Sequence, residues 1–240
     1  MKNILTIMDK EIRAYFSAPI AYLAFFIFLL ISGLFYSHNV IEKHDSRMFD
    51  VFFLMIYLFI LIIPALTMHL FAEERRSGTI ELLMTYPIQD WEVVLGKFLA
   101  GFAIFIGMMV LTFHFPLFLF MWGNSDPGVI ITGYLGLTLL GATFLSIGML
   151  ATSFTQSQNV AYIVAAGILF FLLMILGKIG ESMVGQGAFA DFVAYISFSE
   201  HFRSFAMGII SSRDVIFYLS VIFFALFTSI RVVEINRWKG

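Results

Sequence analysis

The residues best suited to chemistry in this sequence are two histidines and a glutamate in a strongly apolar setting. His69 and Glu73 are four positions apart and therefore share one helix face, and His114 follows in a later apolar run. Imidazole and carboxylate groups can bind zinc, so a membrane-embedded metalloenzyme using His69, Glu73 and His114 is one hypothesis. The alternative is that His69 hydrogen-bonds a neighbouring helix while Glu73 belongs to a charge cluster. Helical spacing brings together only His69 and Glu73, and no pattern fixes a third ligand beside them. We therefore predict no metal site.

Other catalytic patterns are missing from the chain. No phosphate-binding loop of the form G-x-x-x-x-G-K-[ST] occurs, and Gly96-Lys97 is followed by Phe98. Neither H-E-x-x-H nor G-x-S-x-G is present, and the absence of cysteine excludes thiol chemistry. We therefore predict no catalytic residues, no enzymatic activity and no cofactor bound by this chain. Any work it performs must draw energy from a partner or a gradient.

The composition is that of a membrane protein. Hydrophobic residues make up 60% of the 240 positions and charged residues 12%, against roughly 45–50% and 25% in soluble domains. So much apolar surface cannot be hidden in one core, and lipid must be the solvent for most of it. The net charge of −2 argues against nucleic acid as a partner.

Six apolar runs are long enough to cross the hydrocarbon core as helices. They are residues 20–37, 51–71, 98–122, 129–152, 160–176 and 215–230. None contains Asp, Glu, Lys or Arg, which argues against a proton- or ion-coupled carrier. With no tandem repeat or linker between the runs, we predict one all-α membrane domain over residues 1–240.

The positions of Lys and Arg predict the orientation. If the N-terminus is inside, nine of the fourteen Lys and Arg residues lie on the cytoplasmic side and five outside. We therefore expect both termini in the cytosol and a location in the cytoplasmic membrane.

Two segments outside the runs have helical patterns. Residues 1–18 place Ile4, Ile7 and Ile12 at helical spacing with Lys10 and Arg13 among the polar positions, which predicts an amphipathic helix lying on the cytoplasmic leaflet. In the outer stretch 177–214, Ser197-Phe-Ser-Glu200 is a capping-box pattern that precedes Phe198, Phe202 and Phe205 on one face. This predicts a short helix dipping into the outer leaflet, with a stop at Gly208.

Small residues recur in the fourth and fifth runs. Gly141, Gly148 and Thr152 share a face, and Ala161 and Ala165 are four apart. Such spacing lets helices approach closely. It is explained either by packing within the chain or by a seam between two chains.

The cytoplasmic loop Glu73–Lys97 has a pattern of its own. Ser77-Gly78 reads as a turn, residues 79–86 can form two helical turns, and Pro87 stops them. Asp90 can cap the helix that leads into the third run. A short helix with Ile80, Leu83 and Met84 on one side needs a surface to rest on, which is either a partner or the lipid headgroups.

This loop, A-E-E-R-R-S-G-T-I-E-L-L-M-T-Y-P-I from Ala72, closely resembles the ABC-2 type permeases of ATP-binding-cassette (ABC) transporters. The opening Ser17-Ala-Pro-Ile-Ala-Tyr22 and the tail with His201, Gly208, Ser212-Arg-Asp214 and Tyr218 are similar to the same family. Within it, the sequence most resembles the gliding-motility-associated permease subunits. The resemblance covers essentially the full length.

The resemblance implies a role and a set of partners. Two permease chains, identical or related, pair in the lipid membrane, and two ATPase subunits that bind ATP and Mg dock below them. A coupling helix in the first internal loop passes the ATPase movement to the spans. Carried over, the coupling residues are Glu73, Glu74, Ser77, Gly78, Thr79, Glu81, Leu82, Leu83, Met84 and Pro87. The rival hypotheses are the metalloenzyme above and a membrane scaffold that needs no ATPase; the substrate does not follow from the sequence.

Overall fold

The computed structural model describes residues 2–41, 48–76, 89–122, 126–183, 192–193 and 195–237. In this part of the chain the regular elements are helices and no strand occurs. The helices are α1 (Lys2–Ser17), α2 (Pro19–Ile41), α3 (Phe49–Thr67), α4 (His69–Arg76), α6 (Asp90–Leu111), α7 (His114–Trp122), α8 (Pro127–Ser153), α9 (Gln158–Phe170), the π-helix η1 (Phe171–Ile175), α10 (Leu176–Met183), α12 (Phe198–Ala206) and α13 (Ser212–Arg237).

Six helical stretches among the described residues are long and apolar enough to cross a membrane. They are Pro19–Val40, Phe49–Ala72, Asp90–Met121, Pro127–Ser153, Gln158–Ile179 and Ser212–Ile235. The predicted all-α fold with six spans is therefore confirmed, and each stretch contains the core of one predicted run. The third begins at Asp90, eight residues before its predicted start at 98, because the helix continues through Trp91–Lys97 under the cover of α1.

Two spans change their helical geometry along their length. The third is interrupted at residues 112–113, between α6 and α7, just before Pro116, whose ring nitrogen cannot donate to the carbonyl of residue 112. The fifth passes through η1, where the carbonyl of Leu173 accepts a hydrogen bond from Ser199 Oγ at 3.3 Å. Proline and π-turns are the usual sites at which long helices bend.

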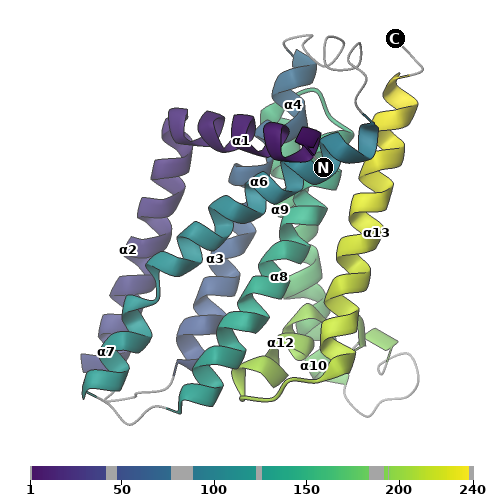
Figure 1. The fold of residues 1–240 in the computed structure, drawn as a ribbon. Coiled ribbons are helices and arrows are strands. Elements are labelled where there is room, and N and C mark those ends of the chain that lie inside the picture. Colours follow the sequence, from purple (N-terminus) through teal and green to yellow (C-terminus); the bar gives the residue numbers. More distant parts are fainter. Residues whose placement is uncertain are drawn as a thin grey trace.

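The spans run side by side, and the short helices gather at the two ends of the bundle (Figure 1). One end carries α1, which lies across the spans, together with α4, the start of the chain and the end of α13; we call it the α1 end. The opposite end carries α7 and α12 and is called the α7 end. Ala18 alone separates the crosswise α1 from α2, which begins at Pro19, and a break at the residue before a proline is expected.

Helix α8 is the centre of the bundle, since it packs against α3, α6, α9, α12 and α13. Its glycines make room for large neighbours: a Cβ on Gly141 would strike the Phe105 ring, and one on Gly148 would lie 2.5 Å from Thr67 Oγ1. Ala161 and Ala165 in α9 are also fully buried within the chain. The small residues of spans four and five therefore serve internal packing, and the alternative of a seam between chains does not hold for them.

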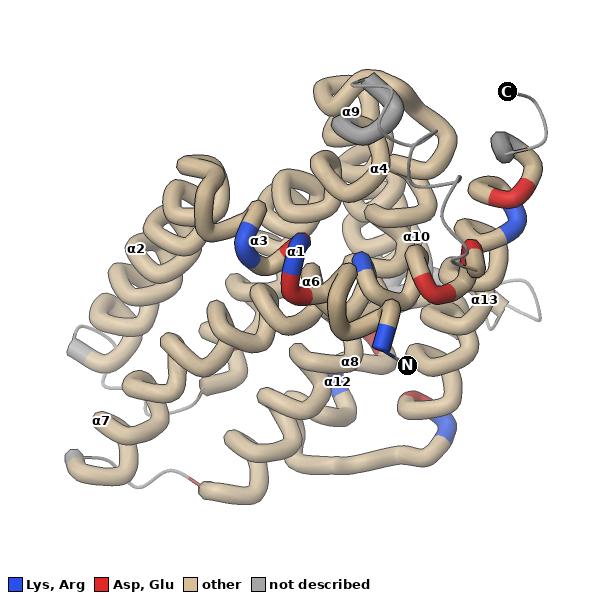
Figure 2. Tube along the Cα trace, turned by 45° about the horizontal axis from the view of Figure 1, so that its top comes forward, with Lys and Arg blue, Asp and Glu red and all other residues tan. Residues whose placement is uncertain are grey.

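Charged side chains stay away from the middle of the described spans. Figure 2 shows Lys, Arg, Asp and Glu on α1 and near the helix ends, with long uncharged stretches between them. The distribution fits a hydrocarbon layer between two polar boundaries.

Candidate functional site

Most of the predicted coupling residues lie outside the described residues. Ser77, Gly78, Thr79, Glu81, Leu82, Leu83, Met84 and Pro87 are in this group, while Glu73 and Glu74 belong to α4, whose bounds are His69–Arg76. The structure thus describes the frame on either side of the loop. Helix α4 leads into it from the second span, and α6 leads out of it into the third.

The first turn of α6 is fastened to its own cap and to the start of the chain. Gln89 is the N-cap and Glu92 completes a capping box, with Gln89 N donating to Glu92 Oε2 at 3.2 Å. The expectation that Asp90 caps this helix is wrong, because Asp90 is its first helical residue. Glu92 Oε2 also accepts a hydrogen bond from Asn3 Nδ2 at 2.9 Å, which ties the loop exit to α1.

One turn further along α6, a buried ion pair joins the same two helices. Lys97 Nζ donates to Glu11 Oε1 at 2.8 Å, and the lysine side chain is only 1% exposed. The ammonium group also lies 5.3 Å from the centre of the Phe71 ring of α4, within the range of a cation–π contact. Lys97 therefore touches α1 and the helices on both sides of the loop.

The backbones of α1 and α6 approach closely between these polar contacts. A Cβ on Gly96 would lie 2.9 Å from Ile7 Cβ and 3.1 Å from the carbonyl oxygen of Ile4, so only glycine fits without a shift. At the far end of α1, the buried Tyr15 hydroxyl donates to the carbonyl of Leu66 in α3 at 2.5 Å. Burial raises the pKa of Tyr15, and Glu11 adds to the effect, so the phenol stays protonated and keeps donating.

These contacts make α1, α3, α4 and α6 one connected unit, which we call the α1 clasp and define by Asn3, Glu11, Tyr15, Glu92 and Lys97 with their partners. Breaking it would leave a charge buried without its counter-charge, which is costly in a low-dielectric setting. The contacts of the α1 clasp fix the position of α1 relative to α3 and to the helices on both sides of the loop.

The proposed metal ligands do not come together. Near His114, Thr112 bonds Tyr134 at 3.0 Å, and Tyr134 packs on Phe52 at the α7 end of α3. His69 follows Phe52 by 69 − 52 = 17 residues along nearly continuous helix, roughly 25 Å away at 1.5 Å per residue. No group of three His, Asp or Glu side chains forms among the described residues. His69 and His114 therefore lie too far apart to bind one metal ion, and the Glu73 side chain lies outside the described part of the structure.

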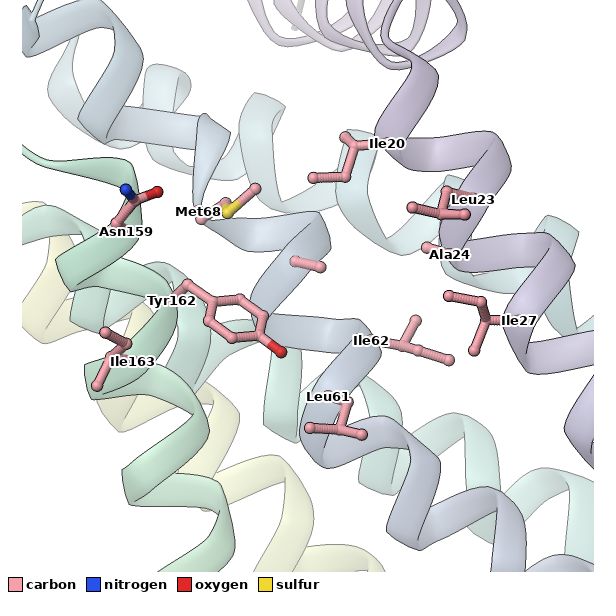
Figure 3. A pocket seen from close by; sticks show the side chains of 11 residues that line it. Ile20, Leu23, Ala24, Ile27, Leu61, Ile62, Met68, Asn159, Tyr162 and Ile163 are labelled. Carbon is pink, nitrogen blue, oxygen red and sulfur yellow. The ribbon is translucent and has the colours of Figure 1, made fainter.

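An open groove of about 660 Å³ lies between α2, α3 and α9 in the α1 half of the bundle (Figure 3). Its lining is Ile20, Leu23, Ala24, Ile27, Leu61, Ile62, Ala65, Met68, Asn159, Tyr162 and Ile163. Tyr162 reaches across from α9 towards α3, and Asn159 is the second polar side chain. With no charged residue in the lining, the groove favours apolar groups over ions.

Fold and frame together define a class: a helical membrane protein of six spans with a crosswise helix clasped to the exit of its first inner loop. Comparison with protein families agrees, since residues 4–230 match the description ABC-2 family transporter protein. The chain belongs to the ABC-2 family, the transmembrane component of ABC transporters and not their ATPase. A search of curated proteins gives no match.

Sequence reasoning missed the Glu11–Lys97 pair, although a signal was available. Ile7, Glu11 and Tyr15 follow one another at four-residue spacing, so the carboxylate sits in the middle of the apolar stripe of α1. An acid in that position needs a buried basic partner. Run length alone places Lys97 at the membrane boundary, because the third apolar run begins one residue after it.

Proposed function

We propose that this chain is the permease subunit of an ABC exporter and that it couples ATP hydrolysis by a separate ATPase subunit to movement across the membrane. The observation that carries the proposal is the match to the ABC-2 family over nearly the whole chain. The chain's lack of a phosphate-binding loop agrees with it, because the ATPase activity must then reside elsewhere.

In this proposal the 77–87 segment is the coupling helix. It connects α4 to α6. Helix α6 is held by α1 through Lys97 and Glu92, and the Lys97 ammonium group also contacts Phe71 of α4. Closure of the ATPase would push the segment, and the α1 clasp would carry the push into the second and third spans together. Glu73 and Glu74, at the end of α4, would form the hinge.

The assembly we propose has two permease chains, identical or related, above two ATPase subunits that bind ATP and Mg. The α1 end would face the cytosol, since nine of the fourteen Lys and Arg residues then lie inside. Helix α1 would lie in the cytoplasmic headgroup layer with its apolar stripe against the bundle. Membership of the gliding-motility subgroup rests only on the overall resemblance of the sequence and stays a prediction.

Charge introduced on the apolar side of the coupling helix tests the proposal. Leu83→Asp or Met84→Asp places a carboxylate where an apolar contact with the ATPase is expected. Each variant should release the partner ATPase from the complex or lower the ATP turnover of the complex by at least about tenfold. The measurement is co-purification and ATP turnover of the complex, with Leu83→Met as the matched apolar control.

In the expected result, Leu83→Met behaves as the wild type, and the Asp variants still insert into the membrane. Unchanged ATPase binding and turnover in both Asp variants would show that this segment is not the coupling helix.

A further inference from the structure

The α7 end contains a buried histidine whose two ring nitrogens both face acceptors. His201 Nδ1 of α12 lies 2.7 Å from Asp214 Oδ1 of α13, and His201 Nε2 lies 2.8 Å from the carbonyl oxygen of Tyr195. His201 is 3% exposed and Asp214 is 5% exposed. The ring also stacks on Phe217 with 4.0 Å between centroids, which holds its orientation.

This geometry requires a proton beyond those of neutral histidine and ionised aspartate. A carbonyl oxygen only accepts, so Nε2 must carry a hydrogen. The short contact at the other nitrogen then needs a hydrogen as well, either on Nδ1 facing a carboxylate or on Asp214 facing the Nδ1 lone pair. In both arrangements the pair holds one proton more and has no net charge.

Burial reinforces this reading. Among the described residues, Asp214 Oδ2 is buried without a hydrogen-bond partner, so an ionised carboxylate facing a neutral ring would be half satisfied and uncompensated. The other titratable or charged groups close by are Tyr195 and Tyr218, whose rings lie 5.7 Å and 6.3 Å from that of His201, and Arg213, which lies 4.6 Å over the Tyr195 ring. Tyr218 donates to the carbonyl of Phe198 and Arg213 faces the Tyr195 ring, so in the described residues Asp214 is the acid that balances the ring.

The pair fastens a helix that is packed into the bundle on its other sides. Phe202 and Phe205 are fully buried, Thr132 of α8 donates to the carbonyl of Phe205 at 2.9 Å, and Ser199 bonds the π-helix at Leu173. Helix α12 thus contacts the fourth, fifth and sixth spans, and its polar links to the sixth are the His201–Asp214 contact and the hydrogen bond from Tyr218 to the Phe198 carbonyl.

We propose that His201 and Asp214 form a proton-binding site and that the bound proton holds α12 against the sixth span. The site is intact as long as the pair holds this proton. When the pH rises until the proton leaves, the remaining N–H can satisfy Tyr195 or Asp214 but not both, and α12 loosens. The α7 end of the transporter is therefore sensitive to the pH on its own side of the membrane.

Hydrogen–deuterium exchange of the full chain in lipid nanodiscs tests the proposal. Exchange of peptides covering 198–206 is followed from pH about 6 to about 9.5, well above the value near 6.5 at which a free histidine loses its proton, and each rate is divided by the intrinsic rate at that pH. Above the point of proton loss, the corrected rate should rise by up to about tenfold per pH unit, as expected for one proton. Peptides from α1 and α6 serve as the internal reference.

Variants assign the effect to the pair. In Asp214→Asn the amide can donate to Nδ1 while neutral His201 donates to Tyr195, so both bonds survive without the extra proton and the protection of 198–206 should become independent of pH. His201→Gln should raise the exchange rate at every pH, and the exposed His114→Gln should leave the wild-type profile unchanged. A flat wild-type profile, or the wild-type rise persisting in Asp214→Asn or His201→Gln, would overturn the proposal, as would its loss in His114→Gln.

Discussion

Lys97 and Glu11 are the charged pair most deeply placed at the α1 end among the described residues, and their burial determines what they do. The ammonium group is 1% exposed and has a carboxylate at 2.8 Å and the face of the Phe71 ring at 5.3 Å. Removing two charges from water is costly, and their attraction compensates only when both are present in good geometry. The pair is therefore better understood as fixing the register of α1 on α6 than as a source of net stability.

Removing one member of this pair should cost more than removing both. We expect Lys97→Met to lower the free energy of unfolding by up to about 3–5 kcal/mol, because Glu11 then keeps only the largely exposed Lys10 ammonium group, 3.8 Å away, as a counter-charge. The double variant Glu11→Leu/Lys97→Met should recover most of that loss. Denaturant titration in mixed micelles measures the free energy of unfolding of the wild type, the single variant and the double variant.

The matched control is the exposed pair Asp9–Arg13 on the same helix, whose side chains are 2.9 Å apart. Arg13→Gln should change stability by less than about 1 kcal/mol, as exposed pairs usually do. Equal losses in Arg13→Gln and Lys97→Met would contradict the assigned role of the buried pair.

At the scale of helices, close packing around α8 determines which glycines matter. Gly141→Ala places a methyl group against the fully buried Phe105 ring and should destabilise the protein by about 1–3 kcal/mol. Gly107→Ala in α6 meets nothing within 4 Å and should be neutral or stabilising by up to about 1 kcal/mol. The same micelle titration compares them, and a Gly107→Ala loss as large as that of Gly141→Ala would show that packing does not control the effect.

The helices that contact lipid could be predicted from the sequence, because lipid contact requires apolar side chains. Apolar run length located six spans, and the pattern Phe198, Phe202 and Phe205 located α12, although Ser197 makes no side-chain cap bond there. The start of the third span was placed too late because α6 continues beyond its apolar run under the cover of α1. The His201–Asp214 contact joins residues whose positions relative to each other depend on the turn at Gly208, where φ is +86°.

At the scale of the whole molecule, the predicted orientation in the membrane can be tested by labelling introduced cysteines, because the sequence contains no cysteine. Ser157, the exposed N-cap of α9, should face the cytosol, and Ser212, at the exposed start of α13, should face outward. In intact cells a membrane-impermeant maleimide should label Ser212→Cys and should label Ser157→Cys only after permeabilisation. The reverse pattern would place the α1 end outside.

The central claim is that this chain works as the membrane half of an ABC transporter, and the mass of its purified complex tests that claim most directly. We predict an assembly with two permease chains of 27.3 kDa, or one and a related chain, together with two ABC ATPase subunits. The purified assembly should hydrolyse ATP. In Leu83→Asp the ATPase should no longer co-purify, and ATP turnover should be lost with it. A complex that purifies intact from its native cells without any ABC ATPase would contradict the account.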